Sequence, residues 1–325
     1  MSSNSALSAA ADAAPASFLA DVLAGLAAPR KHISSKYFYD ASGDALFQQI
    51  MRCPEYYPTR CELEILTQQS AEIAALLTAG RTLFDVVELG AGDASKSVHL
   101  LRAVRVLDPT VTYFPIDISG SVIASLEARL PRELPGLRVR GLHGEYLPML
   151  AESARRSDRP RAVLFMGANI GNMRPAEAAG FGRALRALLT PGDQLLIGFD
   201  LVKSPHAILA AYNDAGGLTR AFNLNLFCRI NRELGADFDV AAFSHFPTYD
   251  PATGACTSFL VSERAQQVRI GEHGMFSFAA GETIHTEISQ KYTLAETDAL
   301  ARAAGFAPVR HFQDRAGAFL VALWA

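Results

Sequence analysis

A glycine-rich segment contains the residues whose types and spacing could do chemistry. It reads ELGAGDASK at residues 88–96 and joins an apolar run to an amphipathic one. Gly90 and Gly92 let the backbone approach a ligand and adopt angles that are closed to other residues. A plain strand-to-helix turn and a G-x-G-x-x-G dinucleotide site are both open interpretations. Ser95 stands at the third glycine position, which disfavours a pyrophosphate, whereas Glu88 fits a cofactor that has an amino-acid part.

Two later apolar runs are also followed by polar side chains. Asp117 closes the run at 111–118, where an acceptor-only carboxylate can bind both hydroxyls of a ribose, although it could instead cap the next helix. Glu145 and Tyr146 follow the run at 137–142, where Tyr146 offers a ring face to an adenine and Glu145 an acceptor to its amine. The loops after neighbouring parallel strands converge on one crevice. Their order along the chain favours S-adenosylmethionine over a nicotinamide dinucleotide.

Apolar runs that alternate with helix-forming segments predict a parallel sheet. They lie at 83–89, 111–118, 137–142, 162–167 and 194–199. Near-continuous apolar strands of this kind are typical of a sheet that helices cover on both faces. Two closing runs, at 309–312 and 318–324, have no long helix between them and predict an antiparallel hairpin at one edge. The predicted fold class is α/β, with a doubly wound Rossmann-like sheet.

The remaining segments predict a second, smaller α+β part. Helices are expected from Ser17 to Pro29, from Glu62 to Gly80, at 205–234, with Tyr212, Phe222, Leu226 and Ile230 facing inward, and from Thr293. Alternating runs at 245–249, 257–262 and 286–292 predict strands, and the segment 36–60 is dense in aromatic residues. Because these segments flank or interrupt the strand–helix alternation, they form an addition to the main sheet.

Composition excludes several classes of protein. A formal net charge of -3 with a sequence pI of about 6.2 gives no field that attracts nucleic acid or an anionic membrane. No apolar run approaches the roughly 20 residues needed to span a bilayer. The four cysteines and eight histidines show no metal-ligand spacing, so we expect no metal, reduced thiols and a cytoplasmic monomer. Residues 1–16 are expected to be a disordered tail.

The longer motifs resemble a known family. They are KYFYDASGDALFQQI, PEYYPTR, ELGAGDASK, PIDIS, GANIGN, AAYNDAGG, FNLNLFCRINRELGADFD and TEISQKY. Together they are similar to the histidine Nα-methyltransferases of ergothioneine biosynthesis, over nearly the whole chain after residue 16. The resemblance implies a methyltransferase domain at 61–202 and 292–325, and a substrate-binding domain at 17–60 and 203–291.

The resemblance also implies a role for individual residues. S-Adenosylmethionine is expected at Gly90, Lys96, Asp117, Glu145 and Tyr146, with Tyr39 close to the reacting centre. The carboxylate and amine of L-histidine are expected at Tyr56, Asn172 and Tyr212, and its imidazole at Glu287 and Ser289.

Elementary chemistry is consistent with the implied substrate roles. Glu287 and Ser289 are two residues apart in an alternating run, so both side chains should project from one face of a strand. Glu287 could accept from one imidazole nitrogen while Ser289 serves the other. The alternatives are a solvated strand face for this pair and core packing for the tyrosines. Lys96 could reach the cofactor carboxylate or simply be solvated.

One strand departs from the family pattern. The run TGACTSFLV at 253–261 matches a family strand that brings a methionine against the substrate ring, and Ser258 stands at that place. This predicts a roomier or more polar pocket than the family usually has.

The implied reaction is methyl transfer from a sulfonium to the α-amine of L-histidine, repeated up to three times to give the betaine. A free amine must lose a proton before each transfer, and we expect Tyr39, or a water that it holds, to accept it. The alternative functions are N-methylation of another amino acid or aromatic amine, a non-catalytic S-adenosylmethionine-binding module, and a nicotinamide dehydrogenase.

Overall fold

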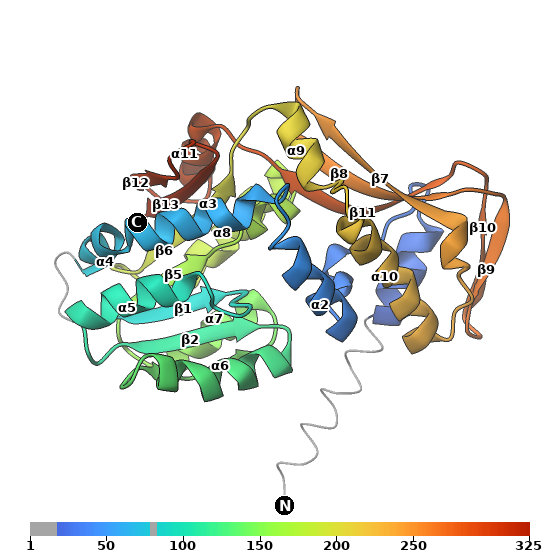
Figure 1. The fold of residues 1–325 in the computed structure, drawn as a ribbon. Helices are drawn as coiled ribbons and strands as arrows, with labels where there is room; N and C mark the ends of the chain where they lie inside the picture. The colour runs from blue at the N-terminus through green and yellow to red at the C-terminus, as the bar shows by residue number, and fades with distance from the viewer. Residues whose placement is uncertain (1–17, 79–82) are drawn as a thin grey trace, which may run out of the picture. The chain divides into compact units, whose positions relative to one another are not determined.

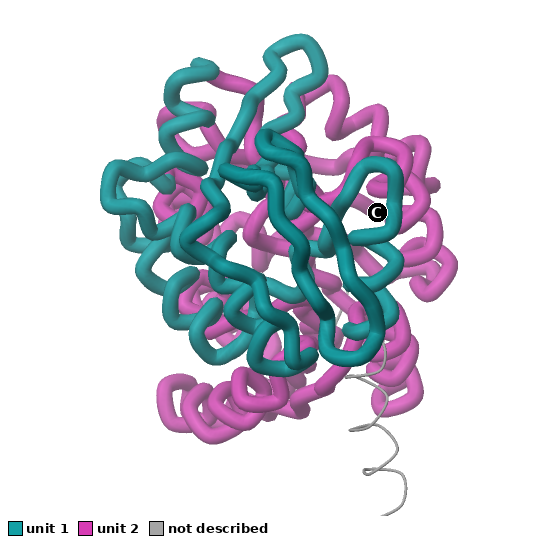
Figure 2. The backbone as a smooth tube through the Cα atoms, turned by 90° about the vertical axis from the view of Figure 1, so that its right-hand side faces the viewer, with its two compact units in different colours: residues 1–56, 204–289 teal, residues 57–203, 290–325 magenta. Residues whose placement is uncertain are grey.

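The computed structural model describes residues 18–78 and 83–325, and it divides into two compact units (Figure 2). Unit 1 comprises the chain up to Tyr56 together with Ser204–Ser289, and unit 2 comprises Tyr57–Lys203 and Gln290–Ala325. The chain therefore crosses between units at 56/57, 203/204 and 289/290, where the sequence predicted 60/61, 202/203 and 291/292. The expected tail, the cap at Ser17 and the helix end at Gly80 lie outside the described residues.

Unit 2 is built on an eight-stranded sheet. Its strands are β1 (Asp85–Leu89), β2 (Thr112–Asp117), β3 (Arg138–Val139), β4 (Leu142–His143), β5 (Arg161–Phe165), β6 (Gln194–Asp200), β12 (Pro308–Gln313) and β13 (Phe319–Trp324). The order is β12-β13-β6-β5-β1-β2-β3, with β4 also paired to β2. β13 runs antiparallel to both β6 and β12, while β1, β2, β5 and β6 are parallel. The predicted fold class and edge hairpin are confirmed.

Helices cover both faces of this sheet (Figure 1). One face packs against α7 (Tyr146–Arg156), α8 (Pro175–Ala187) and α11 (Leu294–Ala303), whose apolar residues share a core with β1, β2, β5 and β6. The other helices of unit 2 are α3 (Tyr57–Gln68), α4 (Ser70–Thr78), α5 (Ser97–Leu107) and α6 (Gly120–Glu133). The helix predicted to begin at Glu62 thus begins at Tyr57 and is divided in two at Gln69. Ser119 caps α6, because its hydroxyl accepts from the amide of Val122.

The strand order places the loops of unit 2 where a ligand would bind. All five residues of β1 are buried, and Leu89 is in register with Ile116 of β2. The sheet grows from β1 toward β2 on one side and toward β5 on the other. In open parallel sheets such a reversal of strand order creates a crevice at the carboxyl ends of the strands. The loops after β1, β2, β4 and β5 all lie at that edge.

Unit 1 is an α+β assembly around one apolar core. It comprises a helix at 18–27, η1 (Ser35–Phe38), α2 (Ala41–Ile50), α9 (Pro205–Ala211), α10 (Leu218–Leu234), η3 (Val240–Ala242), β7 (Phe243–Asp250), β8 (Ala255–Ser262), β9 (Gln266–Ile270), β10 (Gly274–Phe278) and β11 (Thr283–Gln290). Three strands form a sheet in the order β11-β8-β7, and β9 pairs with β10 in a hairpin that the sequence did not predict. The inward-facing side chains predicted for α10 and its approach are all buried.

The single helix predicted at 205–234 is instead two helices. The Asp214 carboxylate accepts from the backbone amides of Leu218 (2.8 Å) and Thr219 (2.7 Å), which starts α10 afresh. Gly217 has a φ of 72°, a left-handed conformation that glycine adopts without strain. The apolar periodicity passes through this break, so periodicity alone did not reveal it. No helix of the described residues combines the length and the apolar character needed to cross a membrane.

Candidate active site

The glycine turn after β1 packs tightly against the loops that follow β4 and β5. Gly90 has a φ of 73°, and a Cβ at this position would lie 2.9 Å from the Tyr146 hydroxyl oxygen and 3.1 Å from Asn169 Nδ2. Any larger residue would be strained and would also collide with both side chains. Gly90 is therefore required by the close approach of three loops, and Asn169 is a neighbour that the sequence did not single out.

Asp117 lies at the end of β2 beside the same turn. Its Oδ2 accepts from the amide of Gly92 at 3.0 Å, and its Oδ1 accepts from the amide of Ser119 at 2.9 Å. These bonds fix the orientation of the carboxylate. Because each carboxylate oxygen has two lone pairs, both can accept a further hydrogen bond, as two ribose hydroxyls would require.

Tyr146 begins α7, directly after Glu145. Its ring makes edge contacts with Phe165 (5.5 Å between centroids) and Phe181 (6.4 Å). Burial, with a smaller effect from the charge of Asp117, raises the pKa of Tyr146 to about 12. The phenol therefore stays neutral and can donate a hydrogen bond at physiological pH, while Glu145 is exposed to solvent.

Lys96 reaches the end of β5 with a buried partner. Its ammonium pairs with the carboxylate of Glu62, which is completely buried in α3. The second carboxylate oxygen of Glu62 accepts from the amide of Gly167 at 2.7 Å. A Cβ at Gly167 would lie 3.8 Å from Lys96 Nζ, so Glu62 holds Lys96 next to the loop after β5. Glu62 was expected only as the start of a helix, and its pairing with Lys96 was not predicted from the sequence.

Glu88 does not take the place expected from its position before the turn. It is 3% exposed and accepts a hydrogen bond from the hydroxyl of Tyr113 in β2. Burial raises the pKa of Glu88 to about 7. The expectation that Glu88 meets the amino-acid part of a cofactor is wrong, because strand alternation directs it into the buried layer between β2 and α5.

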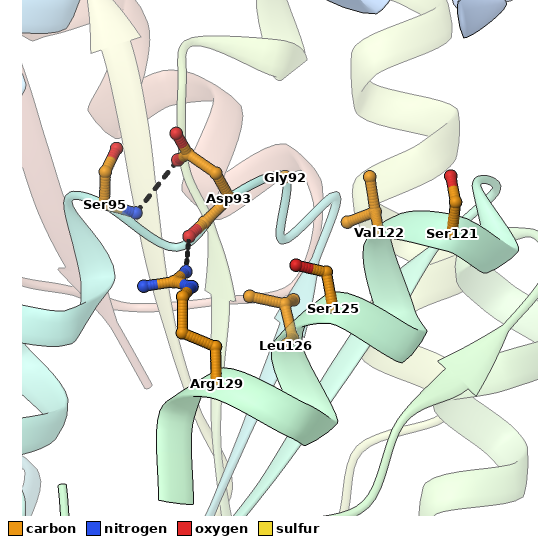
Figure 3. Close-up of a pocket in the computed structure, with 8 residues that line it drawn as sticks. All are labelled: Gly92, Asp93, Ser95, Ser121, Val122, Ser125, Leu126 and Arg129. Carbon is orange, nitrogen blue, oxygen red and sulfur yellow. Dashed lines mark hydrogen bonds between the residues drawn. The ribbon is translucent and has the colours of Figure 1, made fainter. Parts of the chain in front are cut away.

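A solvent-facing cavity of about 370 Å³ borders the other part of the glycine turn (Figure 3). It is lined by Gly92, Asp93, Ser95, Ser121, Val122, Ser125, Leu126 and Arg129. The Arg129 guanidinium donates to the backbone oxygen of Asp93 and to the carboxylate of Glu133. None of the six residues predicted to bind the cofactor lines it, so the contacts between the loops after β1, β2, β4 and β5 define the candidate site.

In unit 1, the predicted tyrosines belong to one aromatic cluster. Tyr39 makes edge contacts with Phe47 and Phe222, at 5.7 Å between ring centroids in each case. Phe47 continues to Tyr56 at 6.2 Å, and Tyr56 to Tyr212 at 6.3 Å. Three side chains from widely separated sequence positions are thus brought into one continuous contact path.

Tyr212 joins this cluster to the strand that was predicted to recognise an imidazole. Its hydroxyl lies 2.6 Å from Ser289 Oγ in β11, and both residues are buried. The structure therefore groups Tyr39, Tyr56, Tyr212 and Ser289 within unit 1. Within unit 2 it groups Gly90, Asp117, Lys96 and Tyr146, and it places Asn172 at the exposed end of η2 (Asn169–Asn172).

The two faces of the β11-β8-β7 sheet separate Glu287 from Ser258. Thr286 donates to Asn223 of α10 at 2.8 Å and to the backbone oxygen of Ser258 at 3.2 Å. Ser258 is 1% exposed and lies on the same face as Thr286, whereas Glu287, the next residue, lies on the opposite face.

Thr257, not Ser258, is the residue of β8 that shares the face of Glu287. On that face the rings of Phe259 and His285 lie 5.6 Å apart. Two residues further along each antiparallel strand, Thr257 comes next to Glu287. Thr257 Oγ1 also lies 2.7 Å from Thr248 Oγ1. Ser258, which was predicted to face the substrate ring, thus lies on the face opposite to Glu287, and Thr257 lies beside Glu287 instead.

The described residues contain no group of three or more histidine, cysteine, aspartate or glutamate side chains arranged to hold a metal ion. The four cysteines, Cys53, Cys61, Cys228 and Cys256, are not joined to one another by disulfides. Burial, followed by the charge of Asp314, raises the pKa of Cys61 to about 12.

Comparison with known proteins gives a match that contains the candidate residues of both units. A family model described as a histidine-specific, SAM-dependent methyltransferase matches residues 18–325. The histidine N-alpha-methyltransferase of Mycobacterium tuberculosis is 39% identical over 306 residues, covering 94% of this chain and 94% of that protein. Ergothioneine biosynthesis protein 1 of Neurospora crassa is 28% identical over 86% of this chain and 31% of its own length. The 4-dimethylallyltryptophan N-methyltransferase easF of Claviceps fusiformis is 32% identical over 60% of this chain and 57% of its own.

Proposed function

Because the chain belongs to the family of histidine-specific, SAM-dependent methyltransferases, we propose that it methylates the α-amino group of L-histidine, up to three times. The observation that carries the proposal is the family match over the whole chain from residue 18, combined with intact candidate residues in both units. The family and the cofactor predicted from the motifs are confirmed by these matches.

S-Adenosylmethionine supplies an electrophilic methyl group on a sulfonium whose departure leaves a neutral thioether. The residues of unit 2 fit this group. Gly90 permits close approach of the backbone, and Asp117 presents two oriented oxygens to the ribose. Tyr146 is a neutral donor with an aromatic face, and Glu145 is an exposed acceptor beside it. Lys96, held by Glu62, supplies a positive charge for the cofactor carboxylate.

We assign the substrate to the aromatic cluster and to β11. Tyr56 and Tyr212, with Asn172, would hold the carboxylate and amine, and their neutral donors suit an anionic group without a buried ion pair. Glu287 and Ser289 would recognise the two imidazole nitrogens. The bond between Tyr212 and Ser289 supports this assignment, because it couples the residues assigned to the two ends of the substrate.

The remaining chemical requirement is removal of a proton from the amine. A protonated amine has no lone pair with which to attack, so each transfer needs one deprotonation, and orientation supplies most of the remaining acceleration. Tyr39 is assigned to this step, directly or through a water that it holds. Its ring is fixed between Phe47 and Phe222, which gives its hydroxyl a defined direction.

A second candidate function is N-methylation of a bulkier aromatic amine. The similarity to a 4-dimethylallyltryptophan N-methyltransferase favours it, as do the small side chains of Thr248 and Thr257 on the face of Glu287. An aromatic ring larger than imidazole would have to be accommodated at that face. Such a substrate would not use the carboxylate of Glu287 as a partner for a second ring nitrogen.

The test is mass spectrometry of L-histidine, L-tryptophan and L-tyrosine, each incubated with the protein and S-adenosylmethionine. Successive addition of one, two and three methyl groups to histidine alone is the expected result. Glu287→Ala should lower kcat/KM for histidine about 10- to 100-fold, the effect of losing one charge-assisted hydrogen bond.

Glu272→Ala is the matched control, because Glu272 is an exposed glutamate of the same unit. Methylation of tryptophan in preference to histidine would establish the second candidate instead. Equal histidine turnover by Glu287→Ala and Glu272→Ala would contradict the assignment of the imidazole site.

A further inference from the structure

One buried carboxylate at the end of β6 gathers three side chains of unit 2. Asp200 is 1% exposed, and both of its oxygens accept from the hydroxyl of Tyr57, at 3.0 and 2.9 Å. Its Oδ2 lies 2.8 Å from the ammonium of Lys291, which is completely buried. The ammonium of Lys203 pairs with its Oδ1 and also donates to the Tyr57 hydroxyl at 2.9 Å. These four residues are called the Asp200 cluster.

The three partners of Asp200 stand at the three places where the chain passes between units. Tyr57 is the first residue of unit 2, Lys203 is the last residue before Ser204 returns to unit 1, and Lys291 is the second residue after the final crossing. Lys203 lies close to Asp200 along the chain, whereas Tyr57 and Lys291 are far from it in sequence. A single side chain therefore ties together all three crossing points.

Each crossing leads along the chain to a residue assigned to the substrate, in one case through a short helix. Tyr56 precedes Tyr57, and Ser289 comes two residues before Lys291. Lys203 leads into α9, and Tyr212 is the residue that caps the carboxyl end of that helix. Tyr56 and Ser289 both contact Tyr212, so the three crossings deliver the three parts of one contact group.

The chemistry of the cluster indicates a geometric role rather than simple stabilisation. Two lysine side chains and one phenol meet one buried carboxylate, and removing such polar groups from water costs desolvation energy that apolar packing would avoid. Burial lowers the pKa of Lys203, partly offset by the charge of Asp200. Backbone hydrogen bonds add to the restraint. The amide of Tyr292 donates to the backbone oxygen of Asp200 at 3.0 Å, and the amide of Val202 donates to the backbone oxygen of Tyr292 at 2.9 Å. What such a cluster supplies is a fixed position for each partner.

We propose that Asp200 is a positioning residue for the amino-acid site. By holding Tyr57, Lys203 and Lys291 at one point, it fixes the unit 2 ends of the three chain segments that lead to the side chains assigned to the substrate. Asp200 is assigned no contact with the substrate, because it is 1% exposed and its carboxylate is occupied by these three partners. This inference rests on the proposed function, because it concerns the residues assigned there to the substrate.

The test compares Tyr57→Phe and Asp200→Asn with a matched control on the same strand. Tyr57→Phe removes one hydroxyl and keeps the ring, so it remains informative if Asp200→Asn fails to fold. Asp193→Asn is the control: Asp193 lies just before the opposite end of β6 and pairs at 2.7 Å with buried Arg161. Since small misplacements of binding groups are costly, we expect both cluster variants to raise KM for L-histidine about tenfold or more. KM for S-adenosylmethionine should change less than about twofold in every variant.

Different outcomes test the positioning role of Asp200 and the proposed function. A rise in KM for histidine in the cluster variants, with no rise in Asp193→Asn, supports the positioning role, because a general loss of stability would affect the control as well. Unchanged KM in Tyr57→Phe and Asp200→Asn, or an equal rise in Asp193→Asn, would refute it. Wild-type protein that turns over no L-histidine would refute the proposed function, and the inference with it.

Discussion

Glu88 makes the stability of unit 2 depend on pH in a direction that the structure fixes. Burial raises the pKa of this carboxyl from 4.5 to about 7, against the opposing effect of the Tyr113 hydroxyl. Between these values the unfolded chain has lost the proton and the folded protein keeps it. The stabilisation is therefore fully present below pH 4.5 and is lost as the pH rises through about 7. A shift of this size corresponds to about 3 kcal/mol of the free energy of unfolding.

Glu88→Gln is the perturbation that isolates this contribution. The amide keeps the shape of the side chain and an oxygen that accepts from Tyr113, but it cannot ionise. Denaturant unfolding, followed by circular dichroism at several pH values from 4.5 to 8, would give the free energy of unfolding of each protein. We expect the difference between Glu88→Gln and the wild type to grow by about 3 kcal/mol in favour of the variant across this range.

Glu72→Gln is the control for this experiment. Glu72 lies on α4 with a side chain that is 49% exposed, and this substitution makes the same chemical change at a solvent-facing site. Its pH dependence should follow that of the wild type. Parallel pH profiles for wild type and Glu88→Gln would refute the reasoning, since they would mean that Glu88 takes up no extra proton in the folded state.

Three further predictions concern single residues of the two units. Gly90→Ala should raise Kd for S-adenosylmethionine at least about tenfold in calorimetry, because the left-handed strain of roughly 1–2 kcal/mol is joined by a clash with the loops. The control Gly192→Ala has a φ of 101° and open space around it, and it should leave Kd unchanged. Equal effects of the two substitutions would contradict the clash. His245→Phe should resist acid unfolding, because burial lowers the pKa of His245 from 6.5 to about 4. The wild type therefore loses up to about 3 kcal/mol of its free energy of unfolding as the pH falls through this window. Among the described residues neither ring nitrogen has a hydrogen-bond partner, and identical acid midpoints would contradict a neutral, unbonded ring in the folded protein. Tyr39→Phe should lower kcat at least about tenfold and change its pH profile, whereas unchanged turnover across pH would remove Tyr39 from proton handling.

The main sheet, the cofactor and the family could all be predicted without the structure. Parallel strands buried on both faces must be apolar almost throughout, so their runs are visible without any knowledge of their neighbours. Polar residues at the ends of such runs lie at one edge of the sheet, which is why Gly90, Asp117 and Tyr146 could be assigned together. The hairpin of β9 and β10 was missed, since its strands are short and half-exposed, and the break before α10 was hidden by a periodicity that continues through it.

The directions of individual side chains and the contacts between distant residues depend on the folded chain and could not be predicted. A shift of one residue along a strand moves a side chain to the other face, so the sequence could name Ser258 where Thr257 lies beside Glu287. The same alternation directs Glu88 into the protein interior. Glu62 and Asp200 gain their roles from partners that are remote along the chain, and those pairings arise only when the folded sheet brings its carboxyl edge together.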